Sequence, residues 1–182
     1  MNIERLAYFF LGNNPIIGSH IKRQIKSLNE RVPPAFKHRQ MDDLGCGDGK
    51  VTILLKEIFL PEKLRGFDIN PHLVRRARAR GIEAEVKNLD EGLPSGEMAV
   101  LWGVLHHLKD KEGCLIKVRQ NYPLIFIREP IRSGPVKWLE LGQPLSKETI
   151  ENLVKEHLPG SQIYYDGHNI LIFYMSATSH PA

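Results

Sequence analysis

The stretch Met41-Asp42-Asp43-Leu44-Gly45-Cys46-Gly47-Asp48-Gly49 decides the fold of this chain. It reads as a short strand, an acidic residue and three glycines at alternate positions, followed by a helix that begins near Lys50. Glycine lets the backbone turn sharply and lets a ligand approach the main chain, because it carries no Cβ. The stretch therefore predicts a strand, a ligand-binding loop and a helix in succession. The alternative is an ordinary tight turn between a strand and a helix.

The loop chemistry favours a cationic ligand over a pyrophosphate. A dinucleotide-binding loop follows the pattern G-x-G-x-x-G, and here the third glycine of that pattern is replaced by Lys50. The acidic Asp43 directly before the loop would repel a phosphate group and attract a positive charge.

Composition is consistent with a small enzyme of one domain. A length of 182 residues with 42% hydrophobic and 25% charged residues is ordinary for a globular protein. No apolar stretch approaches the roughly 20 residues needed to span a bilayer, and the first ten residues lack a signal-peptide pattern. We therefore expect a cytoplasmic location and no membrane partner. Two cysteines, Cys46 and Cys114, are too few for a disulfide framework or a four-cysteine zinc site, so no metal is predicted.

Helical and strand patterns alternate after the loop. Asn70 caps and Pro71 opens a helix that ends at Gly81, and Ser146 caps a later helix. Strands are predicted at residues 64–68, 82–86, 98–102 and 124–127, and helices at residues 50–60, 71–80, 110–120 and 147–158. Alternating strands and helices imply right-handed crossovers and a doubly wound sheet.

Two further strands close the pattern. Residues 162–165 and 169–174 are joined through Asp166-Gly167, a strong hairpin signal. The predicted fold class is therefore α/β, with a doubly wound, mostly parallel seven-stranded sheet and a C-terminal antiparallel hairpin.

Basic residues are unevenly distributed in a chain of net charge +4 and pI near 9.1. Such patches suit RNA or an anionic substrate, whereas the plainer interpretation is a solvated helix face. One group precedes the loop and the other falls on a single later helix: Lys22, Arg23, Lys26, Arg31, Lys37 and Arg39, then Arg75, Arg76, Arg78 and Arg80.

The motif D-x-G-x-G-x-G closely resembles the nucleotide loop of class I S-adenosylmethionine (SAM) methyltransferases. The terminal hairpin also resembles that fold, and the resemblance covers roughly residues 38–175. The segment Leu105-His106-His107-Leu108 looks like one common in the type 11 branch, and GIEAEVKNLDEGLP looks like the MetW-like subset. The resemblance implies SAM as cofactor, S-adenosylhomocysteine as product and a Rossmann-like fold.

The resemblance also implies a set of site residues at successive strand ends. Asp68, about 20 residues after the loop, would accept the ribose hydroxyls; its alternative role as a helix cap is better filled by Asn70. Asp90 would bind the adenine amino group while Leu89 packs on the ring. The backbone near Trp102 and Gly103 would approach the methionine portion. The remaining cofactor-binding residues are Asp43, Gly45, Cys46, Gly47, Gly49 and Ile69.

Methyl transfer needs a base only where the acceptor must lose a proton. His107 is the candidate base, with His106 as the other possibility. The alternative is that His107 only shapes the pocket. We expect His106, one residue away, to point elsewhere.

Residues 1–37 are predicted to hold two helices that serve as a lid, residues 38–175 to form the SAM-binding domain, and residues 176–182 to form a flexible tail. Asp42 stands where a buried aliphatic residue is usual, so it must be solvated, paired with a base or protonated.

The functional hypothesis is a SAM-dependent methyltransferase that acts on a small molecule. Two alternatives remain open: an RNA methyltransferase, and a SAM-binding accessory protein without turnover. The sequence leaves the methyl acceptor and the oligomeric state undetermined.

Overall fold

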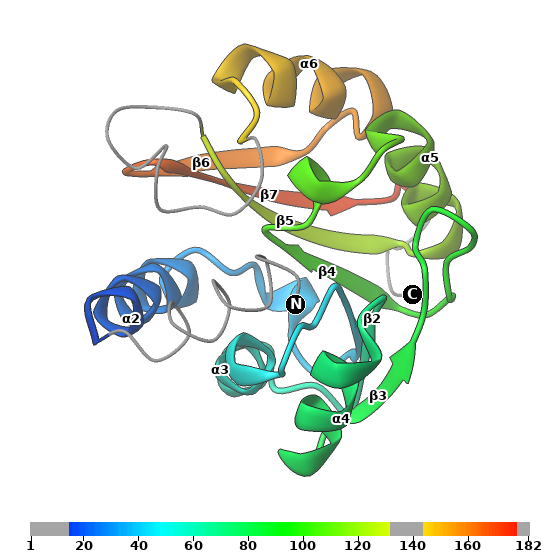
Figure 1. Ribbon diagram of the computed structural model, residues 1–182. Coiled ribbons are helices and arrows are strands. Elements are labelled where there is room, and N and C mark those ends of the chain that lie inside the picture. The colour runs from blue at the N-terminus through cyan, green and yellow to red at the C-terminus, as the bar shows by residue number, and fades with distance from the viewer. Residues whose placement is uncertain (1–14, 132–143, 178–182) are drawn as a thin grey trace.

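The computed structural model describes residues 15–131 and 144–177 and shows one seven-stranded sheet between two layers of helices (Figure 1). The strand order is β3-β2-β1-β4-β5-β7-β6. Strands β1 to β5 are parallel, β7 runs antiparallel to β5, and β6 runs antiparallel to β7. The predicted fold class, including the terminal hairpin, is therefore confirmed. The strands are β1 (Gln40–Leu44), β2 (Lys63–Asp68), β3 (Glu83–Val86), β4 (Met98–Trp102), β5 (Leu124–Pro130), β6 (Gln162–Asp166) and β7 (Asn169–Met175).

The helices begin at the capping residues that the sequence indicates. The side chain of Asn70 accepts a hydrogen bond from the backbone N–H of His72, and that of Ser146 accepts one from Thr149. Residues 87–97 join β3 to β4 without a helix. No helix in the described ranges is long and apolar enough to cross a bilayer. The helices are α2 (Pro15–Asn29), α3 (Lys50–Phe59), α4 (Pro71–Ala79), α5 (Lys111–Asn121) and α6 (Lys147–His157), with short 3-10 turns η1 (Pro34–Phe36) and η2 (Leu105–His107).

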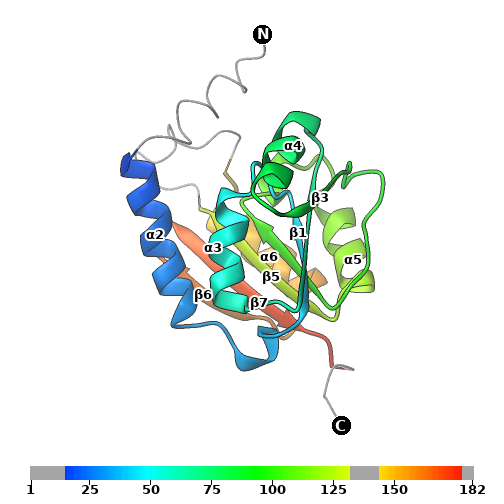
Figure 2. The same cartoon turned by 90° about the horizontal axis from the view of Figure 1, so that it is seen from below.

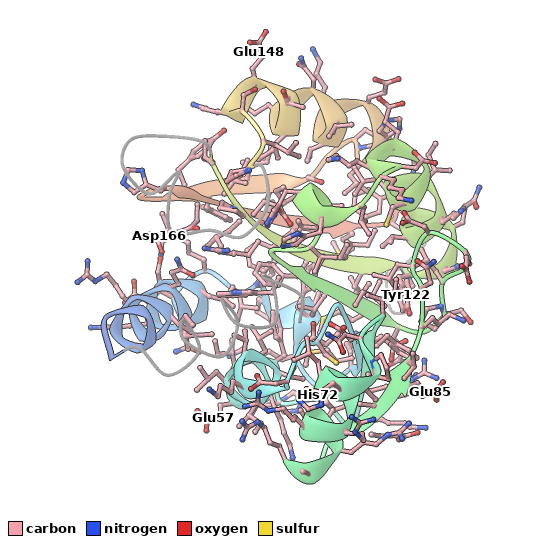
Figure 3. The ribbon with its side chains drawn as sticks, in the orientation of Figure 1. Glu57, His72, Glu85, Tyr122, Glu148 and Asp166 are labelled. Atoms are coloured by element: carbon pink, nitrogen blue, oxygen red, sulfur yellow. The ribbon has the colours of Figure 1, made fainter. Side chains whose placement is uncertain are left out.

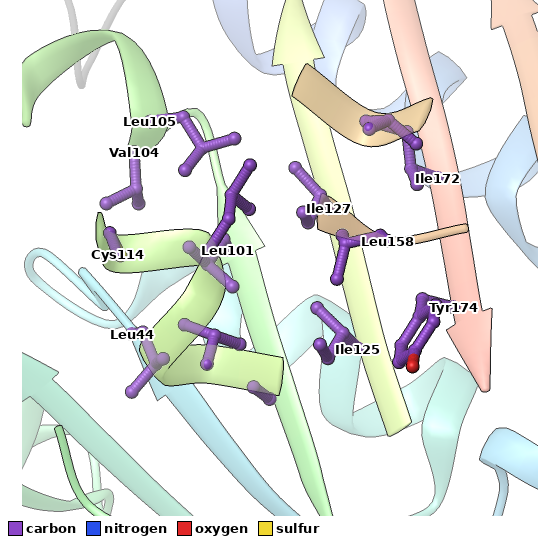
Figure 4. Close-up of a cluster of buried hydrophobic side chains, with 14 of the residues drawn as sticks. Leu44, Leu101, Val104, Leu105, Cys114, Ile125, Ile127, Leu158, Ile172 and Tyr174 are labelled. Carbon is purple, nitrogen blue, oxygen red and sulfur yellow. The ribbon is translucent and has the colours of Figure 1, made fainter. Parts of the chain in front are cut away.

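Each face of the sheet buries its own apolar core. On one face, α5 and α6 contribute Leu115 and Ile150 to a cluster that includes Leu101 and Ile127 of the central strands (Figure 4). On the other face, α2 and α3 cover a second cluster that is rich in aromatic residues, while α4 packs a smaller third one. Charged side chains such as Glu57 of α3 and Glu148 of α6 extend outward from the two helical layers (Figure 3). The central strands are consequently buried on both faces, as continuous apolar runs predict.

Helix α2 belongs to the body of the fold. It lies beside α3 on the sheet (Figure 2), and Leu28 near its C-terminal end is fully buried in the second cluster. The second of the two predicted N-terminal helices is thus present. The first falls on residues 1–14, outside the described residues, as does most of the predicted tail. The lid and the domain boundaries stay predictions.

Asp42 is paired with a base. The carboxylate is 0% exposed and receives two hydrogen bonds from Arg65, at 2.8 Å from Nε to Oδ1 and 2.6 Å from Nη2 to Oδ2. The Tyr122 hydroxyl donates a third at 2.7 Å to Oδ2. A second hydrogen bond from Arg65 Nη2 reaches the carbonyl of Ser95 at 2.9 Å, which fixes the segment before β4. Of the alternatives that the sequence left open for Asp42, pairing is the one observed.

Candidate cofactor and active site

The loop after β1 has no room for side chains at two of its glycines. Gly45, Gly47 and Gly49 all have positive φ angles, of 91°, 55° and 81°. A Cβ on Gly45 would lie 2.5 Å from Cγ2 of Val104, and one on Gly49 would lie 2.4 Å from Cδ1 of Ile82. These separations are far below van der Waals contact, so the loop is pressed against the segment after β4 and against the residue that precedes β3. Its glycines meet both a conformational and a packing requirement.

Asp48 joins the loop to helix α4. Its carboxylate lies 3.3 Å from Arg76 Nη2 and 3.3 Å from Arg80 Nη2, and Arg80 Nε donates to its carbonyl at 2.9 Å. Arg78 donates to the carbonyl of Ala84 at 2.6 Å. Three of the four arginines of the predicted basic cluster therefore hold α4 against the loop and β3.

Asp43 is a buried acid with one hydrogen-bonded oxygen. It is 2% exposed, and Thr52 Oγ1 of α3 donates to Oδ2 at 2.6 Å. Its other oxygen, Oδ1, is buried and has no hydrogen-bond partner in the structure. Burial raises the pKa of Asp43 from 3.8 to about 7; the Thr52 hydrogen bond opposes that rise, and repulsion from Asp68 adds to it. An orphaned carboxylate oxygen of this kind fits a cationic ligand group.

Asp68 at the end of β2 is oriented by backbone groups. Gly47 N donates to Oδ2 at 2.9 Å and Asn70 N donates to Oδ1 at 2.8 Å. Burial raises the pKa of Asp68, and these two hydrogen bonds oppose the rise. Each carboxylate oxygen keeps a further acceptor site, which two adjacent hydroxyls of a ribose can use. Ile69 follows with 63% of its surface exposed, as an apolar platform beside that carboxylate.

Cys46 is a core residue of the loop. It is 6% exposed and clusters with Val74 and Ala77 of α4, as is typical of a small buried hydrophobic residue. Burial is the main cause that raises the pKa of the Cys46 thiol, and repulsion from Asp43 and Asp68 raises it further. The thiolate form of Cys46 is therefore disfavoured.

The segment after β3 presents a second orphaned acid. Asp90 Oδ1 is buried and has no hydrogen-bond partner, while its backbone N–H donates to Asn88 Oδ1 at 3.1 Å. This arrangement fits the predicted contact with an exocyclic amino group. The neighbouring Leu89 is 6% exposed and lies in the core cluster with Leu115, so most of its surface already packs within the protein.

Trp102 ends strand β4 and Gly103 follows it, beside Arg128 of β5. The Arg128 guanidinium lies 5.3 Å from the centroid of the Trp102 ring. Gly103 has a φ of 67° and donates its N–H to the carbonyl of Arg128 at 2.7 Å. A Cβ on Gly103 would lie 3.4 Å from Arg128 Nη1, so the chain turns closely over this side chain.

Glu129 is the site residue that sequence reasoning missed. It is 0% exposed, and its Oε1 accepts hydrogen bonds from the backbone N–H groups of Val104 and Leu105, each at 2.7 Å. Its Oε2 lies 2.7 Å from Nδ1 of His106. One buried carboxylate thus organises the whole turn after β4. The available signal was the charged pair Arg128-Glu129 directly after the apolar run of residues 124–127, at the end of a central strand.

The two histidines lie together. Their ring centroids are 4.0 Å apart, because residues 105–107 form a tight 3-10 turn. The expectation that His106 points elsewhere is therefore wrong. The His106 side chain is 5% exposed and paired with Glu129, whereas His107 is exposed.

These features define a class of protein. In a doubly wound sheet, ligands bind beyond the carboxyl ends of the parallel strands. Here the three acids, the glycine loop and the histidine turn lie at or just after the carboxyl ends of β1 to β4. Together with the strand order 3-2-1-4-5-7-6, this is the fold of a class I methyltransferase.

The comparison with protein families agrees with this assignment of the fold. The profile of the methyltransferase domain family matches residues 17–179, and the chain belongs to that family of SAM-dependent methyltransferases. The narrower resemblance to the MetW-like subset stays a prediction.

Curated relatives match over shorter stretches. Methionine S-methyltransferase of Arabidopsis thaliana is 38% identical over 50 residues, which are 28% of this chain and 5% of that protein. Trans-aconitate 2-methyltransferase of Rhodococcus jostii is 33% identical over 82 residues, 45% of this chain and 32% of that protein. The chain therefore spans a third or less of the length of these relatives.

Solved structures share the fold at low identity. A putative methyltransferase in complex with the Trm112 methyltransferase activator of Haloferax volcanii superposes with a TM-score of 0.72 at 15% identity, covering 98% of this chain and 97% of that one. Human N-acetylserotonin methyltransferase in complex with SAM gives 0.68 at 18% identity, covering 84% and 51%.

Proposed function

We propose that this protein binds SAM beyond the carboxyl ends of β1 to β4 and transfers its sulfonium methyl group to a small-molecule acceptor. The observation that carries the proposal is a pair of buried, unpartnered carboxylate oxygens, Asp43 Oδ1 and Asp90 Oδ1, on either side of the oriented Asp68. SAM offers an ammonium, a ribose diol and an adenine amino group, and these are the partners that such oxygens require.

The protein itself contributes recognition and positioning. Asp43 receives the ammonium, Asp68 the ribose hydroxyls and Asp90 the adenine amino group, while the closely packed glycine loop lets the ligand approach the backbone. Bound SAM supplies an activated methyl group on a sulfonium. The chain has to hold the nucleophile in line with that methyl group and keep water away.

His106 is the better candidate for the general base. Glu129 accepts the hydrogen bond at Nδ1, and this arrangement selects the tautomer whose Nε2 carries a lone pair. A base at this position is needed for an acceptor that must lose a proton, such as a hydroxyl or an amine.

A small-molecule acceptor is favoured over RNA. The relatives are named for methionine and trans-aconitate, both small molecules. Arg76, Arg78 and Arg80, which suggested an RNA surface, are engaged by Asp48 and by the carbonyl of Ala84. The proposal of an accessory protein without turnover rests on no comparable observation.

Cofactor binding tests the first half of the proposal. Isothermal titration calorimetry should show SAM and S-adenosylhomocysteine binding with micromolar affinity, about 8 kcal/mol. NAD is the control ligand, because its pyrophosphate should be repelled by the acids around the loop. Binding of NAD with no heat from either SAM or S-adenosylhomocysteine would contradict the proposal.

Turnover tests the second half. Transfer of a radiolabelled methyl group can be followed against a panel containing methionine, trans-aconitate, N-acetylserotonin, simple phenols and amines. For an acceptor with a hydroxyl or amine, His106→Gln should lower turnover by about 10²–10⁴, and His107→Gln should have a smaller effect. An equal loss in both variants would mean that the turn only shapes the pocket. SAM binding without transfer to any panel member would favour an accessory role.

A further inference from the structure

Thr52 is not among the site residues that the sequence predicts. It is 0% exposed in the first turn of α3, directly behind the glycine loop, and its hydroxyl donates to Asp43 Oδ2 at 2.6 Å. The next oxygen within reach, the Cys46 carbonyl, is 3.5 Å away. Because a hydroxyl has a single proton to donate, the short contact to Asp43 is the one that it makes.

The Thr52 hydrogen bond divides the Asp43 carboxyl group into two unlike oxygens. Oδ2 is fixed against α3, and Oδ1 is buried without a partner. A charged carboxylate with an unsatisfied buried oxygen is costly, and protonation or a cationic partner removes that cost. Without ligand, protonation is the available route.

The groups around Asp43 also favour its protonated form when no ligand is bound. Among the described residues, the carboxylate of Asp68 on β2 raises the pKa of Asp43 by repulsion, and the thiol of Cys46 in the loop lies in the same buried environment. Burial, together with repulsion from Asp68, brings the pKa of Asp43 to about 7, so that it is close to half protonated at neutral pH.

We propose that Thr52 is a positioning residue that holds Asp43 with Oδ1 available to the ammonium group of the cofactor, and that cofactor binding displaces a proton from Asp43 to solvent. This inference rests on the proposed function, because it requires that SAM or S-adenosylhomocysteine binds at the loop. In the exchange, the O–H bond of protonated Asp43 breaks, the proton passes to the buffer, and the ammonium donates to the freed oxygen.

The sign of the pH dependence follows. The ligand binds the ionised form of Asp43, so affinity is highest well above pH 7 and declines as the pH falls through that value. For a single group that titrates near pH 7, the affinity at pH 6 should be about tenfold lower than at pH 8.

Calorimetry with S-adenosylhomocysteine in buffers of different ionisation enthalpy, phosphate and Tris, counts the protons released. We expect about half a proton per ligand at pH 7, a value near one at pH 6 and a value near zero at pH 8. As a control ligand, 5′-methylthioadenosine lacks the ammonium group and should bind without this release. Equal release with both ligands would show that the ammonium is not the partner.

Three variants separate the parts of the inference. Asp43→Asn should abolish the release, and any pH dependence that remains belongs to Asp68. Thr52→Val keeps the volume but loses the donor, so the midpoint of release should move to higher pH. Thr52→Ser restores the hydroxyl and should restore the midpoint.

Binding without proton release in the wild-type protein, or an unchanged midpoint in Thr52→Val, would overturn the inference. No binding at any pH would instead overturn the proposed function.

Discussion

Asp42 and Asp43 are consecutive residues of β1 that face opposite sides of the same sheet and are satisfied in different ways. Asp42 receives three short hydrogen bonds, two from Arg65 and one from Tyr122, so both of its oxygens are engaged. Asp43 receives one, from Thr52, and keeps a buried oxygen without a partner. Both acids are almost completely buried. The difference teaches that two acids buried to the same degree can be satisfied to different degrees, and that the count of partners rather than burial marks Asp43 as a candidate binding residue.

The largest expected effect comes from removing the hydrogen bonds that Asp42 receives from Arg65. Arg65→Met leaves the Asp42 carboxylate buried with Tyr122 alone, and the free energy of unfolding should fall by about 3–5 kcal/mol, measured by urea denaturation. The matched control is Lys63→Met on the same strand, whose 3.9 Å contact with Glu83 is exposed. Its effect should stay within about 0.5 kcal/mol. A loss of similar size in both variants would show that the Asp42 pairing is of no special importance.

Asp68 is intermediate, since each of its oxygens has one backbone donor and room for another partner. Asp68→Ala should weaken binding of SAM by about 2–4 kcal/mol, on the scale of charge-assisted hydrogen bonds, while circular dichroism shows the fold retained. Glu85→Ala on the neighbouring strand β3, where the side chain is exposed, is the calorimetric control and should leave affinity unchanged. Unchanged affinity in Asp68→Ala would mean that the ribose binds elsewhere.

The smallest effect concerns stability against pH in the absence of ligand. The folded-state pKa of Asp43, about 7, exceeds its ordinary value of 3.8, so its contribution to stability is fully present below pH 3.8 and is lost as the pH rises through 7. Between pH 5 and pH 8 the wild-type protein should lose about 2–3 kcal/mol more unfolding free energy than Asp43→Asn. Parallel stability curves for the two proteins would indicate that Asp43 is ionised throughout.

The sequence predicted the elements because each carried a local signal. Asn70 and Ser146 mark helix starts, Gly81 a helix end and Asp166-Gly167 the hairpin, and each of these cues depends on a few neighbouring residues. The oddity of Asp42 was also visible, although its partners Arg65 and Tyr122 lie 23 and 80 residues away and no local pattern names them.

The site features that the sequence did not predict depend on contacts between segments that are distant in the sequence or on the exact local backbone geometry. Glu129 reaches the turn after β4 only because β5 pairs with β4 in a register that sets Arg128 opposite Trp102. The roles of His106 and His107 could not be separated by periodicity either, because the segment is a tight 3-10 turn rather than an α-helix. Thr52 looked like an ordinary helix residue, since its importance lies in a hydrogen bond to β1.

The reversed strand β7 has a consequence for synthesis of the protein on the ribosome. Strand β5 is buried along its whole length and pairs with β4 on one side and with β7 on the other. A nascent chain that has completed β5 at Pro130 still lacks its second neighbour until residues 169–175 are made. Until then it presents the open edge of an apolar strand, which is a template for association with other chains. Chains that stall or are truncated before residue 169 should therefore aggregate or be captured by chaperones.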